Sequence, residues 1–319
     1  MKKQLILFLV CFLLFGVFSK TLAQVFPIDL ISYNSSPDQA INFVVMGDGY
    51  KADQQDKFIQ DTKRAIDVMF QQEPWLSHVN DINVYAIKVV SNEQGAASDP
   101  SELIDNYFGS TFNYAGIERL LVPLRTGKIL DVLNSNAPFF DLPIIIVNDS
   151  RYGGSGGYFS TFSSGPSSEE VMIHEIGHSF SGLADEYWAG DQYAVEKPNL
   201  TQDNNIETNR WKSLLNVNGV GIFSHEESPT WFRPHQNCKM RFLGREFCEV
   251  CLLQLNNTID LYTQTSALDL PIAFFGANKL EILEQNTVNF FDLSTQLPSS
   301  WNWSFPGGTP ATSNLQNPI

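Results

Sequence analysis

Three apolar runs in the first half of the chain predict buried strands. They occupy residues 41–46, 82–90 and 142–147. Between the first two, apolar residues recur at helical spacing from Phe58 to Phe70, and Asp53 can cap the helix that they predict. A further helical pattern covers residues 117–133, although Pro123 interrupts it. Strands that alternate with helices are typical of an α/β domain.

A glycine-rich stretch at residues 152–166 precedes the next predicted helix. The glycines suit a bend, after which residues 158–162 can run extended as an edge strand. Ser167 and Glu170 have the spacing of a capping box, in which two side chains satisfy free amides at the start of a helix. The pattern therefore predicts a helix that begins near Ser167.

The pattern changes again from about residue 268, where short alternating apolar runs are separated by turn residues. Apolar side chains at every second position are typical of strands with one buried face. We therefore expect a separate all-β unit at residues 265–319, and the sequence stops before such a unit would be complete.

The first residues have the pattern of a secretory signal. Lys2 and Lys3 precede an apolar run at residues 5–18, and small residues stand before Gln24. The alternative, an uncleaved membrane anchor, needs a longer run, because a spanning helix takes about 20 residues. We therefore expect residues 1–23 to be a signal peptide. The mature protein is then secreted or held at the cell surface, without membrane contact of its own.

Composition and charge indicate a folded protein that does not bind nucleic acid. The chain has 319 residues, of which 43 % are hydrophobic, so it can bury a large core. Its net charge is −15 and its pI is near 4.6. A chain this acidic repels phosphate backbones, which argues against nucleic acid as a partner.

Three cysteines remain after the signal peptide, at positions 238, 248 and 251. In an oxidising exterior we expect one disulfide and one remaining thiol, and the pairing among Cys238, Cys248 and Cys251 stays open. Metal binding by the three thiolates is the weaker alternative, because the chain has no second CxxC pair.

The strongest candidate chemistry lies in the segment HEIGHSFSGLADEY at residues 174–187. His174 and His178 are four residues apart, so a helix places both imidazoles on one face, where they can share a zinc ion. Glu175 lies one step round the helix, where it can polarise a zinc-bound water and act as the catalytic base. The spacing therefore predicts a Zn²⁺ site of the peptidase type.

A catalytic zinc needs a third protein ligand, and Asp185 and Glu186 are the near candidates. A continued helix would place Asp185 about 10 Å along the axis from His178, too far for a shared metal. The helix must therefore break, and Gly182 is where a left-handed turn costs least. We favour Asp185 as the ligand and expect Glu186 to orient a histidine.

Two further side chains have candidate roles and ordinary alternatives. Tyr187 either helps to hold the oxyanion or is a packed aromatic residue. Met240 either lies beneath the metal in a tight turn or belongs to the core.

These segments together resemble the IgA-peptidase-type zinc metallopeptidase family of bacteria. The features that carry the resemblance are VVMGDGY at 44–50, INVYAIKVVS at 82–91, HEIGHSFSGLADEY, and CKMR with FCEVC at 238–251. The resemblance implies zinc held by His174, His178 and Asp185, with Glu175 as base. It implies an α/β (α+β), metzincin-like peptidase domain at residues 24–264. Metzincins place a glycine three residues, and the third ligand six residues, after the second histidine. Here Gly182 and Asp185 stand four and seven residues after His178.

Residues 274–319 resemble the first part of a PKD-type domain, a partial immunoglobulin-like β-sandwich. Such modules are usually spacers or binders, which implies surface or glycan contact. The leading hypothesis is a secreted zinc-dependent metalloendopeptidase that acts on proteins or peptides. The alternative is an extracellular surface-binding or glycan-binding protein with a structural or decayed metal site.

Overall fold

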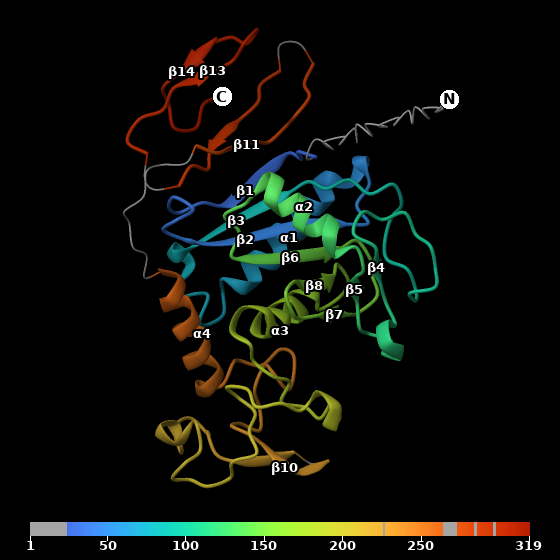
Figure 1. Cartoon of the computed structure of the whole chain (residues 1–319), viewed down its shortest axis with the longest axis vertical. Coiled ribbons are helices and arrows are strands. Elements are labelled where there is room, and N and C mark those ends of the chain that lie inside the picture. The colour runs from blue at the N-terminus through green and yellow to red at the C-terminus, as the bar shows by residue number, and fades with distance from the viewer. Residues whose placement is uncertain (1–23, 226, 264–272, 284–285, 296–297) are drawn as a thin grey trace, which may run out of the picture.

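The computed structural model describes residues 24–225, 227–263, 273–283, 286–295 and 298–319 (Figure 1). The predicted signal peptide, residues 1–23, lies outside these ranges. Within them, every helix is too short or too polar to cross a membrane.

A six-stranded mixed sheet forms the centre of the molecule (Figure 1). Its spatial order is β1 (Ile28–Ser32), β3 (Ile82–Ile87), β2 (Ile41–Asp48), β6 (Leu142–Val147), β8 (Ser160–Ser163) and β7 (Gly154–Ser155). The four inner strands are parallel, and β1 and β7 run antiparallel at the two edges. The three apolar runs of the sequence are therefore adjacent central strands, which explains why they are apolar on both faces.

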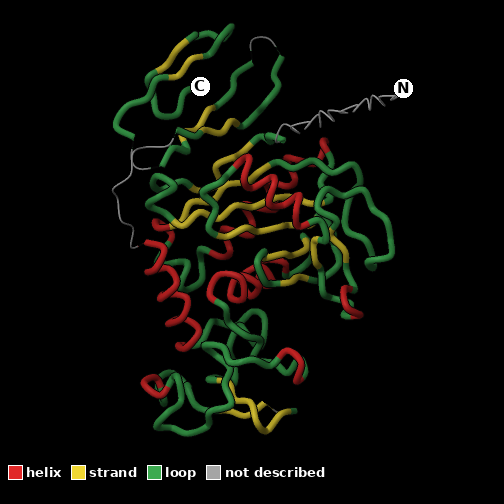
Figure 2. The backbone as a smooth tube through the Cα atoms, viewed as in Figure 1, coloured by secondary structure: helices red, strands yellow, loops and turns green. Residues whose placement is uncertain are grey.

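Helices cover both faces of the sheet, as the red segments of Figure 2 show. The helices are α1 (Gln55–Met69), α2 (Thr126–Asn136), α3 (Ser168–Ser181) and α4 (Glu249–Thr263). Alternate residues of β2 face opposite layers. Phe43 packs in the core formed with α1, α3 and α4, whereas Val44 packs in the core formed with α2. The predicted mixed α/β class is confirmed.

Two predicted elements have different bounds from those expected. Residues 117–133 are helical only in their second part, because Val122–Pro123 forms a short strand, β5, paired with β4 (Ser110–Thr111). The extended stretch after the glycines is β8, which begins at Ser160 and lies between β6 and β7 rather than at the sheet edge. The prediction of an edge strand at 158–162 was therefore wrong, because β7 folds back over it.

The predicted capping box at the start of α3 was also wrong. Ser167 has a left-handed backbone with φ of 61°, and its side chain makes no cap hydrogen bond. Glu170 instead accepts hydrogen bonds from Lys239 Nζ, Gln72 Nε2 and the Gly244 amide. Long-range partners thus outcompete the local cap, and Glu170 ties α3 to the segment around Lys239.

This ion pair makes stability depend on pH. Burial raises the pKa of Glu170, but the hydrogen bond and charge of Lys239 outweigh it and hold that pKa below its usual value. A lowered carboxyl pKa stabilises the fold above the unfolded value of about 4.3 and loses that contribution as pH falls through the folded value. Lys239 is only 1 % exposed, so Glu170→Gln leaves a buried charge unpaired.

We expect Glu170→Gln to lower the free energy of unfolding by about 1–3 kcal/mol at neutral pH. The difference from the parent should shrink in acid, where the parent carboxylate is itself protonated. Urea unfolding at neutral and at acidic pH measures both values. Glu169→Gln, the same change one residue earlier at the Arg64 pair, is the matched control. A loss that is the same at both pH values would contradict the prediction.

The last described residues form two short antiparallel pairs. They are β11 (Phe275–Ala277) with β12 (Phe290–Asp292), and β13 (Trp303–Ser304) with β14 (Thr312–Ser313). Leu293 belongs to the core that includes α2, and Phe274 packs edge-to-face on Phe139. The end of the chain therefore packs against the α/β domain, and its PKD-type character stays a prediction.

Beyond α3 the chain is mostly loop until α4 begins, as the green tube in Figure 2 shows. Among the described residues of this stretch, the regular elements are two 3-10 turns, Asp191–Tyr193 and Lys212–Leu214, and β9 (Phe223–His225) paired with β10 (Ser228–Arg233). We call residues 182–248 the loop segment. In Figure 1 it lies on the side of α3 that faces away from the sheet.

Candidate active site

Three side chains meet at the C-terminal end of α3: two histidines on the helix and one aspartate that follows the turn after it. The Nε2 atoms of His174 and His178 lie 3.1 Å apart. Asp185 Oδ1 lies 3.0 Å from the first and 3.2 Å from the second. The structure thus brings together the two histidines and the acidic residue that the sequence suggested.

Asp185 reaches the histidines because α3 ends where the sequence predicts. Gly182 adopts a left-handed backbone with φ of 64°, and its amide donates to the His178 carbonyl at 3.0 Å. The bond from the Gly182 amide closes a C-terminal cap of the αL type, and the Leu183 amide donates in addition to the Gly177 carbonyl at 3.1 Å. The chain therefore turns back towards α3 three residues before Asp185.

Each imidazole is oriented by a backbone carbonyl. His178 Nδ1 lies 2.7 Å from the Leu183 oxygen, and His174 Nδ1 lies 3.1 Å from the Lys239 oxygen. A carbonyl only accepts, so both Nδ1 atoms carry a hydrogen. In the neutral rings the Nε2 lone pairs then face the shared space.

This donor set fits a zinc ion. Zinc bonds to nitrogen and oxygen of about 2.0–2.1 Å in a tetrahedron place the ligand atoms about 3.3 Å apart. The three separations here are 3.0, 3.1 and 3.2 Å. Burial lowers the pKa of His178, but Asp185 outweighs it and raises that pKa to about 9. A metal would therefore displace a proton from His178 as it binds.

Glu175 lies next to the histidines and is almost fully buried. Its carboxylate and the ligand atoms of His174 and His178 lie within 4.8 Å of one another. Burial raises the pKa of Glu175, and the two imidazoles partly offset this effect. A Cβ on Gly156 would lie 3.0 Å from Glu175 Oε2 and 2.5 Å from His178 Cβ. Only glycine therefore lets the segment that follows β7 pass so close to this carboxylate.

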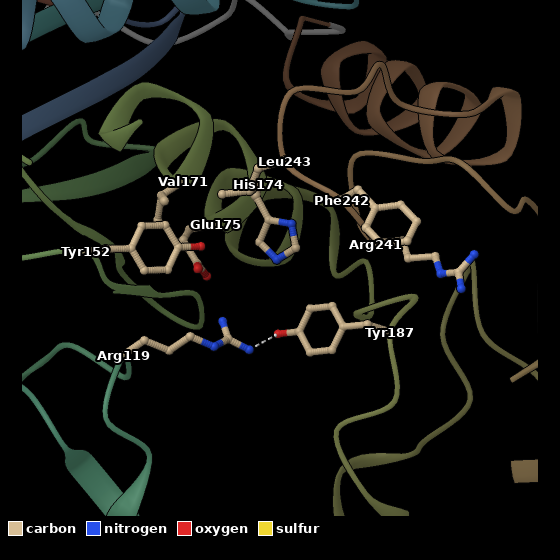
Figure 3. A pocket seen from close by; sticks show the side chains of 9 residues that line it. All are labelled: Arg119, Tyr152, Val171, His174, Glu175, Tyr187, Arg241, Phe242 and Leu243. Atoms are coloured by element: carbon tan, nitrogen blue, oxygen red, sulfur yellow. Dashed lines mark hydrogen bonds between the residues drawn. The ribbon is translucent and has the colours of Figure 1, made fainter. Parts of the chain in front are cut away.

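Tyr187 faces the same space and is held by a residue that the sequence patterns did not indicate. Arg119 Nη2 donates to the Tyr187 hydroxyl at 3.0 Å (Figure 3). The Tyr187 ring stacks on His174 at 6.5 Å between centroids. Burial, with the nearby Asp185 charge, raises the pKa of the Tyr187 phenol, so it stays protonated and can donate a hydrogen bond.

Two cavities open on Glu175. The first, of about 350 Å³, is lined by His174, Glu175, Arg119, Tyr187 and Tyr152 among others (Figure 3). The second, of about 680 Å³, includes His178, Asp185 and residues 154–157. Arg119, Glu175 and Tyr187 line both. The candidate base therefore borders both cavities.

Glu186 points away from the histidines, so the expectation that it orients one of them was wrong. Its side chain is fully buried and lies beside the cysteines, with Oε1 3.3 Å from Cys251 Sγ. Burial, together with the nearby Cys248 charge, raises the pKa of Glu186 to about 8. Asn199 braces this turn by bonding both the Ala184 backbone and Glu186 Oε1.

The cysteines also differ from expectation, because Cys238, Cys248 and Cys251 are all free thiols in the structure. The predicted single disulfide is therefore not formed. Met240 is fully buried and packs against α3 at Gly177, where an added Cβ would lie 2.8 Å from its Sδ atom. The structure thus places Met240 in the core against the helix that carries the two histidines.

Comparison with known families identifies the class of this protein. The IgA Peptidase M64 family matches residues 30–223, which is more than half of the chain. The chain therefore belongs to this peptidase family. The match includes the histidine motif and Glu186, and it ends before the three cysteines. The comparison with curated proteins finds no match.

Proposed function

We propose that the protein is a secreted zinc endopeptidase that hydrolyses peptide bonds within protein or peptide chains. The observation that carries this proposal is the convergence of His174, His178 and Asp185 beside the buried Glu175 carboxylate. The family match supports the peptidase class, and the predicted signal peptide supports secretion.

Each residue of the site has a distinct role in the proposed mechanism. When bound by the two histidines and Asp185, zinc supplies a Lewis acid that polarises a carbonyl and acidifies water. Glu175 takes the proton of the attacking water and returns it to the leaving amine, a role that suits a carboxylate with a raised pKa. The Tyr187 hydroxyl donates to the oxyanion that forms on the carbonyl, and Arg119 holds that hydroxyl in place.

The shape of the site favours cleavage inside a chain. Glu175 lines both cavities, which together offer space for residues on both sides of a scissile bond. Residues 160–163 of β8 cannot take up a substrate strand, because β8 already has a partner strand on each side. Side chains that line the two cavities contribute to recognition of the substrate.

Proteomic mapping of cleavage sites, with zinc present and after chelation, tests the proposal. We expect cleavage at internal peptide bonds that stops on chelation and returns with zinc. Cleavage that continues after complete zinc removal would overturn the zinc mechanism. A protein that binds surfaces or glycans and cleaves no peptide under either condition would support the binding-protein alternative.

A further inference from the structure

We propose a second metal site in this protein, a structural zinc site that is separate from the histidine site and takes no part in the chemical step. Its ligands are the side chains of Glu186, Cys238, Cys248 and Cys251. Their four ligand atoms all lie within 4.8 Å of one another, and all four residues are buried.

The sulfur separations suit a metal and not a disulfide. Cys238 Sγ and Cys251 Sγ are 3.7 Å apart, whereas a disulfide bond is about 2.05 Å long. Four ligands in a tetrahedron around zinc, with bonds to sulfur of about 2.3 Å, place two sulfurs about 3.7–3.8 Å apart. The same geometry places a sulfur and a carboxylate oxygen about 3.5 Å apart, close to the 3.3 Å between Cys251 and Glu186.

The fourth proposed ligand is Glu186, and a disulfide between two of the cysteines would not explain why a carboxylate is buried beside them. Glu186 is fully buried, and its Oε2 atom has no hydrogen-bond partner in the described parts of the chain. An ionised carboxylate in such a place is costly unless it is paired or bound to a metal. Three thiolates and one carboxylate form a closed set of four ligands, which is typical of structural rather than catalytic zinc.

The site would join three parts of the molecule, in addition to contacts such as the hydrogen bond from the Glu186 amide to the Met240 carbonyl. Glu186 follows the end of α3, Cys238 lies late in the loop segment, and Cys248 and Cys251 flank the start of α4. The Cys248 amide donates to Cys238 Sγ at 3.3 Å, as backbone amides do around bound thiolates. Because the loop segment has little secondary structure, a metal there contributes directly to its folding.

Metal content and cobalt spectroscopy on the full chain test this site without reference to activity. We expect about two zinc ions per chain in the parent protein. After exchange for Co²⁺, the spectrum should show a thiolate-to-cobalt charge-transfer band in the near ultraviolet. His174→Ala should lose one metal ion and keep that band, because it removes only the histidine site.

Changes at the new site should give the opposite result. Cys251→Ser should lose one metal ion together with most of the charge-transfer intensity. Glu186→Gln, which keeps the size of the side chain, should keep the sulfurs but shift the cobalt spectrum. If Cys251→Ser does not fold, the presence or absence of the thiolate-to-cobalt band in the parent protein still tests the proposed site. A parent without the thiolate band, or with an intact mass that shows a disulfide, would overturn the proposal while leaving the peptidase function open.

Discussion

Glu175→Gln should lower kcat for peptide hydrolysis by about 10²–10⁴-fold, the usual contribution of a positioned acid–base group. The glutamine keeps the size of the side chain but cannot take a proton. Because Glu175 lies beside the histidines without being one of the three converging ligands, the zinc content should stay that of the parent. Steady-state kinetics on a fluorogenic peptide, with metal analysis of the same sample, measures both quantities.

The matched control for Glu175→Gln is Glu169→Gln, the same chemical change at the start of α3. Glu169 bonds Arg64 on the outside of the helix and lies away from both cavities. This control should keep the parent activity. An active Glu175→Gln enzyme with a full complement of zinc would show that another group is the base.

Asp185→Asn should have the second large effect, on zinc affinity at the histidine site. The change keeps the shape but removes the charge that converges on both Nε2 atoms at 3.0 and 3.2 Å. Mutation of an outer-sphere partner of a metal usually lowers metal affinity by about 10–100-fold. Replacement of a direct ligand should therefore lower the zinc affinity by more than about 100-fold. Competition with a zinc-binding dye measures the affinity, and peptide hydrolysis should fall with zinc occupancy.

Glu186→Gln separates the two candidate carboxylates in the same assay. Its side chain lies among the cysteines, away from the histidines, so the zinc affinity of the histidine site should stay within a few-fold of the parent. If Glu186→Gln weakened that site more than Asp185→Asn did, the assignment of Asp185 as third ligand would be wrong.

Local chemistry accounts for what the sequence could predict about the site. Helical spacing alone brings His174 and His178 together, and the left-handed preference of Gly182 explains how Asp185 comes back to them. The central strands were predictable for a similar reason, because inner parallel strands need apolar residues on both faces. Each of these features depends on residues close together in the chain.

Long-range partners account for most of what the sequence could not predict. Arg119 meets Tyr187 across 68 positions, and no local pattern indicates that pairing. Glu170 has the spacing of a cap, yet it bonds Lys239, 69 positions away. The cysteines predicted one disulfide, which was wrong, and only the fold shows that a buried carboxylate lies beside the three free thiols.

Asp185 and Glu186 are neighbours in the chain that face two different sites, and this makes the two sites thermodynamically linked. Ordering one residue of backbone costs about 1–2 kcal/mol, and a ligand that immobilises Glu186 immobilises the adjacent Asp185 at the same time. An ion at the cysteines would therefore make binding at the histidines modestly tighter, and by reciprocity the converse would hold with the same factor. Loss of the ion at the cysteines would then weaken zinc binding at the histidines without abolishing it, while it loosens the loop segment.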